Sequence, residues 1–146
     1  MKISAQDSLA WEVVAQIIKE NEPAEYRYLG DIIDNSLNAK PQQDMAGAFD
    51  VGDTVQYLAN QLFPIIKYVI AIIAPDILHG LSAMTLEQLK KVLFSSEKGV
   101  TAQVKYSPTE VRKIVLAVCR KKKLSGELAD SIADAIALRL LTPPER

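Results

Sequence analysis

One apolar stretch decides the fold of this 146-residue chain: LFPIIKYVIAIIA, residues 62–74. It contains a single charge, Lys67, and a single proline, Pro64. As a helix this stretch would extend about 20 Å, whereas the hydrocarbon core of a bilayer is about 30 Å thick. A lysine near the middle of a membrane would cost about 3 kcal/mol. The stretch therefore predicts the central helix of a bundle rather than a membrane-spanning segment.

This central helix is expected to begin at Asp53 or Thr54 and to end at Ala74, before Pro75-Asp76. Most of its positions are apolar, and small or polar residues form one narrow stripe: Asn60, Pro64, Lys67, Ala71 and Ala74. Such a pattern is typical of a nearly buried helix. Because proline removes a backbone donor, we expect a kink or a restart at Pro64.

Helical patterns surround this stretch on both sides. Apolar residues recur at intervals of three and four over residues 5–21, 23–37, 85–94, 107–121 and 127–141. Cap residues mark several of the starts: Ser4 or Asp7, Thr85 with Gln88, Ser107 with Glu110, and Ser125. We therefore expect one all-α domain over residues 1–146, an irregular bundle of about six helices around the central one. The last two helices, within residues 107–142, form a helical hairpin.

Two segments lack a helical pattern. Residues 38–52 contain several turn formers and predict a loop of about fifteen residues, near the upper limit for a structureless connection. Residues 95–106 predict an extended linker before the hairpin. Within it VTAQVKY, residues 100–106, alternates with period two, as strands do. It either lies across the bundle or offers a strand edge to a partner.

Composition favours a globular chain in a reducing compartment. The hydrophobic fraction of 49% and the charged fraction of 24% are ordinary for globular proteins. Cys119 is the only cysteine, so no disulfide forms within the chain. The first residues lack the apolar core of a secretory signal. We therefore expect a cytoplasmic protein.

No pattern in the sequence indicates catalysis, a cofactor or a metal site. His79 is the only histidine, and Cys119 lies on the apolar stripe of its helix. Glu127, Asp130 and Asp134 share one helix face, but no loop or amide ligands accompany them, so a solvated face is favoured over a cation site. Phosphate-binding glycine loops and zinc-ligand spacings are missing as well. We expect the protein not to be an enzyme.

Charge is distributed unevenly along the chain. Residues 1–80 contain five Lys and Arg against eleven Asp and Glu, whereas residues 81–146 contain twelve against seven. The basic residues concentrate in one turn, here called the basic turn: Arg120, Lys121, Lys122 and Lys123. The acidic residues of the first half suggest a complementary surface, here called the acidic face: Glu20, Glu22, Glu25, Asp31 and Asp34.

These two surfaces predict a non-catalytic protein-interaction module that binds a protein partner or a second copy of itself. The alternative is a membrane-active protein that inserts residues 62–74. Nucleic acid is less favoured, because the pI is 5.8 and no aromatic residue interrupts the basic turn.

Overall fold

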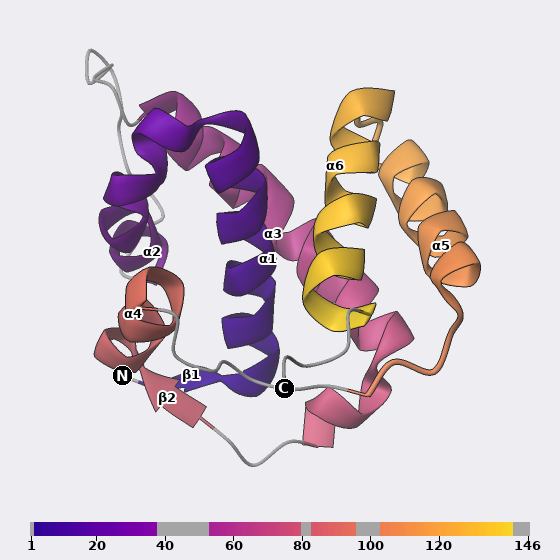
Figure 1. Cartoon of the computed structure of the whole chain (residues 1–146), viewed down its shortest axis with the longest axis horizontal. Coiled ribbons are helices and arrows are strands. Elements are labelled where there is room, and N and C mark those ends of the chain that lie inside the picture. Colours follow the sequence, from indigo (N-terminus) through magenta and orange to yellow (C-terminus); the bar gives the residue numbers. More distant parts are fainter. Residues whose placement is uncertain (1, 38–52, 80–82, 96–102, 142–146) are drawn as a thin grey trace.

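The computed structural model describes residues 2–37, 53–79, 83–95 and 103–141, which form an irregular bundle of six α-helices (Figure 1). This confirms the predicted all-α bundle with a C-terminal helical hairpin. The elements follow in the order β1 (Lys2–Ser4), α1 (Ala5–Asn21), η1 (Pro23–Tyr28), α2 (Leu29–Leu37), α3 (Asp53–Ile73), η2 (Pro75–His79), β2 (Ala83–Thr85), α4 (Leu86–Ser95), α5 (Pro108–Lys121), α6 (Gly126–Ile136) and η3 (Ala137–Leu141). Segments η1 and η2 are 3₁₀ helices, and η3 is a π-helix.

The centre of the bundle is shared by α1 and α3. In α1, eleven of the seventeen residues are buried, including every residue from Ser8 to Ala15. The ring of Trp11 stacks on that of Phe63 in α3, with centroids 4.5 Å apart. The buried apolar side chains of α1, α3, α5 and α6 belong to one cluster. The hairpin therefore packs on the same core as the N-terminal helices.

The stripe of small and polar residues on α3 marks its outer side, as predicted. Asn60 and Pro64 are exposed and Lys67 is half-buried, although Ala74 at the end of the stripe is fully buried. Lys67 is tied to the start of α1: its Nζ lies 2.9 Å from a carboxylate oxygen of Asp7. Gln6 also donates to the Lys67 carbonyl, at 3.1 Å. The one charge of the apolar stretch thus stays at the rim of the core.

Of the two outcomes expected at Pro64, a kink or a restart of the central helix, the restart does not occur. A single helix, α3, continues through Pro64 from Asp53 to Ile73. Pro64 lies on the exposed side of α3, away from the core, and the helix accommodates this residue without a backbone donor. The missing hydrogen bond is therefore tolerated without a break.

Side-chain caps fix the helix starts at the expected positions. The Asp7 N–H donates to Ser4 Oγ at the start of α1, and the Leu128 N–H donates to Ser125 Oγ at the start of α6. The other two starts are full capping boxes, Thr85 with Gln88 before α4 and Ser107 with Glu110 before α5. These local contacts explain why the sequence predicted the helix boundaries well.

A small antiparallel ribbon was not expected. Strands β1 and β2 pair Ile3 with Met84, and the buried Ile3 side chain joins the core. The predicted strand signal over residues 100–106 lies partly outside the described residues. Its described part, residues 103–106, forms no strand, and the Lys105 N–H instead donates to the Ile73 carbonyl at 3.1 Å. This part of the linker lies against the end of α3.

The apolar stretch of residues 62–74 belongs largely to the hydrophobic core of the bundle. Seven of its residues are buried: Leu62, Ile65, Ile66, Val69, Ile70, Ile73 and Ala74. Among the helices of the described ranges, none has the length and the apolar character needed to cross a bilayer. The predicted loop over residues 38–52 lies outside the described residues.

Candidate functional site: two charged surfaces

The basic turn is a rigid connection between α5 and α6. Its backbone closes α5 with three hydrogen bonds, from Lys122 to Val118, from Lys123 to Arg120 and from Leu124 to Cys119, at 3.0 to 3.1 Å. The last two form the paired pattern of a Schellman motif. The turn therefore holds its side chains in a defined place instead of on a free loop.

The four cations of the basic turn are available to a partner. All four side chains are exposed, and within the described part of the chain none of them forms an ion pair. They also lie at the C-terminal end of α5, where the helix dipole favours positive charge. The fold thus stabilises the cluster without neutralising it.

Lys123 has an unusual backbone conformation. Among the described residues that are not glycine it alone has a positive φ, of 61°. A side chain in this left-handed region costs about 1–2 kcal/mol, and glycine or asparagine usually fills this position after a helix. The chain therefore has a lysine where glycine would be less strained.

Replacing Lys123 with glycine is expected to raise the free energy of unfolding by about 0.5–1 kcal/mol. Relief of the left-handed strain exceeds the entropy that glycine adds to the unfolded chain. Urea denaturation followed by circular dichroism would measure this gain. Lys122→Gly is the matched control, since it removes the same charge at a φ of −89°. It should lose stability, so equal shifts in both variants would contradict the strain at Lys123.

The acidic face is largely exposed. Glu20 and Glu22 flank the end of α1, Asp31 and Asp34 lie on the outer side of α2, and Glu25 in η1 is half-buried. Glu20 accepts a hydrogen bond from Gln16 Nε2 at 2.7 Å. Of the five predicted residues, Glu25 is thus the one least able to reach a partner.

The two cations within the acidic segment, Lys19 and Arg27, lie over aromatic rings. The Lys19 ammonium lies 5.7 Å from the centroid of the Tyr26 ring, and the Arg27 guanidinium lies 4.9 Å from that of Tyr28. Both cations therefore rest on aromatic faces. No ion pair between them and the acidic face occurs in the described residues.

The fold brings the basic turn and the part of the acidic face beside the end of α1 to one end of the molecule. Helix α2, which carries Asp31 and Asp34, runs down the left side from this end. Helices α1 and α5 both run toward the upper end in Figure 1, so the end of α1 and the α5–α6 turn lie at that end. The end of α1 lies to the left and the turn to the right. In the parts of the chain that the structure describes, no ion pair joins the two surfaces.

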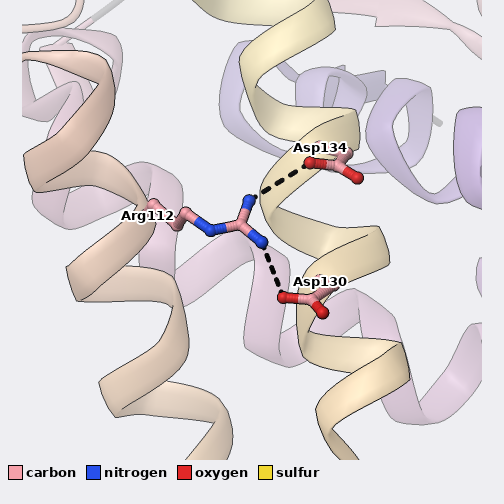
Figure 2. A network of polar contacts seen from close by, with 3 residues as sticks. All are labelled: Arg112, Asp130 and Asp134. Atoms are coloured by element: carbon pink, nitrogen blue, oxygen red, sulfur yellow. Dashed lines mark hydrogen bonds and ion pairs between the residues drawn. The ribbon is translucent and has the colours of Figure 1, made fainter.

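A second acidic cluster, on α6, is occupied by an arginine. Arg112 reaches across from α5, and its two terminal nitrogens lie 2.7 Å from Asp130 Oδ1 and 3.2 Å from Asp134 Oδ1 (Figure 2). This fork fastens the two helices of the hairpin to each other. The described residues also contain no group of three ligands suited to a metal ion. Arg112 therefore acts within the fold and is not part of the basic turn.

The structure gives Cys119 no catalytic setting. It is buried in the core, and burial raises the pKa of its thiol. A protonated, enclosed thiol is a poor nucleophile. The side chain of His79 lies outside the described residues.

One polar contact was missed entirely by sequence reasoning. Arg139 in η3 donates through Nε to Glu12 Oε1 in α1, at 2.6 Å. The Glu12 side chain is only 7% exposed and that of Arg139 25%. The sequence contains one signal of this contact: a charged residue, Glu12, within the apolar run LAWEVVA, residues 9–15. Its partner is 127 positions away, so spacing could not reveal it.

Two pockets on the described surface are smaller than most binding sites for small molecules. One, of about 230 Å³, lies beside the Glu12–Arg139 pair and is also lined by Gln16, Lys19 and Tyr26. The other, of about 250 Å³, lies between the start of α5 and α6. Binding sites for small molecules usually occupy about 300–1,000 Å³. The charged surfaces are therefore the stronger candidates for function.

Comparison with known proteins finds no match. No protein-family model matches this sequence, and neither a curated protein nor a solved structure is similar to it. The functional assignment must therefore come from the two charged surfaces themselves.

Proposed function

We propose that this chain is a non-catalytic protein-interaction or self-association module, an adaptor that works through complementary charges. The observation that carries the proposal is the basic turn: four exposed cations on a capped helix end, which form no ion pair with the described residues. Lys123 adds to this argument. Glycine at this position would have less backbone strain. A lysine there is expected if its positive charge contributes to binding.

The alternative of a membrane-active protein is less well supported. Insertion of residues 62–74 would move seven buried side chains of α3 out of the core. The module also fits the cytoplasm, because its single cysteine is reduced and buried. A protein partner is favoured over nucleic acid, since the acidic face at the same end would repel phosphates.

A capture experiment from the native host tests this function. The tagged chain is compared with the variant Lys121→Glu/Lys122→Glu, and bound proteins are quantified at low and high salt. We expect at least one protein, including a second copy of the chain, to lose binding in the variant and at high salt.

The matched control is Lys91→Glu/Lys113→Glu, which changes the net charge equally at two exposed lysines of α4 and α5. It should leave capture unchanged. If no captured protein distinguishes the basic-turn variant from this control, the basic turn is not a binding surface.

A further inference from the structure

The shared end of the molecule restricts how partners can be arranged. Residues 19–34 contain five carboxylates and two cations, and residues 120–127 contain four cations and one carboxylate. The two segments therefore have net charges of equal size and opposite sign. Because α1 and α5 end on the same side, the end of α1 and the basic turn face a partner that approaches from this end, whereas α2 runs down the left side (Figure 1).

We propose that the partner is a second copy of this chain, and that the two copies form a two-fold symmetric dimer through this end. The inference rests on the function proposed above. The two-fold axis would be perpendicular to the plane of Figure 1 and would lie just beyond the upper end, midway between the end of α1 and the α5–α6 turn. Rotation by 180° about it places a second copy above the first, with the left and right sides of this end exchanged. Each basic turn then lies opposite the acidic face of the other copy.

Symmetry favours this closed dimer over a chain of copies. In the dimer both charged surfaces of both copies are paired, through two identical contacts. Once the first contact has formed, the second is intramolecular and needs no further loss of free motion. A head-to-tail chain of copies would leave one acidic face and one basic turn unpaired at its two ends. Each added copy would also bring like-charged surfaces of neighbouring copies close together, because both charged surfaces of a copy lie near the same end.

The dimer is expected to be weak and sensitive to salt. Pairs of exposed charges contribute little individually, because water and ions screen them. The screening length falls from about 30 Å at 0.01 M salt to about 3 Å at 1 M. Association should therefore be clear at low salt and lost at high salt.

Sedimentation velocity of the purified chain over a range of concentrations tests the proposal. We expect a monomer–dimer equilibrium at low salt and a monomer at high salt. Lys121→Glu/Lys122→Glu should weaken the dimer at least tenfold, about 1.4 kcal/mol. Lys91→Glu/Lys113→Glu should leave it unchanged. Mixing the first variant with Glu20→Lys/Glu22→Lys should give a heterodimer, although each alone stays monomeric.

Three results would overturn the proposal. One is a monomer at every concentration and salt, and another is growth beyond the dimer. The third is equal weakening in the basic-turn variant and in its control. These results leave the proposed function to be judged separately, because a different protein captured through the basic turn would support that function even for a monomeric chain.

Discussion

Arg139→Ala is expected to lower the free energy of unfolding by about 3 kcal/mol. Removing one member of a buried ion pair leaves the other charge poorly compensated, which costs about 3–5 kcal/mol. The lower end applies here, because the Arg139 side chain is 25% exposed and a pocket beside it admits water. Urea denaturation followed by circular dichroism would measure the loss.

Two further variants separate the ion pair from other effects. Arg120→Ala removes an exposed arginine that forms no ion pair with the part of the chain that the structure describes, and it should change stability by less than about 0.5 kcal/mol. The double variant Glu12→Met/Arg139→Met replaces both charged side chains with apolar ones, so most of the loss should be recovered. If Arg139→Ala behaves like Arg120→Ala, the pair does not hold the hairpin to α1.

Local signals explain what could be predicted from the sequence. The bounds of α1 were anticipated from Ser4, which caps its start, and from Pro23, which prevents its continuation. The start of α5 followed from the capping box of Ser107 and Glu110. Each signal lies within a few residues of the boundary it sets. The apolar periodicity then indicated which faces meet in the core.

Features that depend on distant contacts could not be predicted. The strands β1 and β2 are three residues long, too short for a period-two pattern, and their pairing joins positions about eighty residues apart. The Glu12–Arg139 contact likewise needs the folded chain. Part of the second predicted helix is the 3₁₀ segment η1, and the last predicted helix ends in the π segment η3. Packing decides such variations in helical geometry.

The charged surfaces could be predicted from the sequence only in part. Their residues were identified from the sequence, because charge and exposure follow from residue type. Their placement at one end depends on the parallel directions of α1 and α5, which no local pattern encodes. The sequence also did not indicate that Arg112 forms ion pairs within the hairpin. Residue type alone does not distinguish an arginine that binds a partner from one that pairs within the fold.

Pro64→Ala is expected to raise the free energy of unfolding by up to about 3 kcal/mol. Alanine restores the backbone N–H that proline lacks and has the highest helix propensity, whereas proline has the lowest. Because Pro64 is exposed, the change leaves no cavity in the core. The same denaturation measurement applies, with Gln61→Ala as an exposed control on α3 that alters no backbone bond. A neutral or negative effect would mean that solvation already compensates the missing bond.

The same variant shows whether α3 must bend when the protein binds its partner. α3 is continuous through Pro64, so a rigid core should be enough to display the charged surfaces. Pro64→Ala is then expected to be more stable and to associate as the unaltered chain does in sedimentation. A variant that gains stability but no longer associates would show instead that the proline serves as a hinge. In that case the stability lost at Pro64 would be what allows the bundle to change shape on binding.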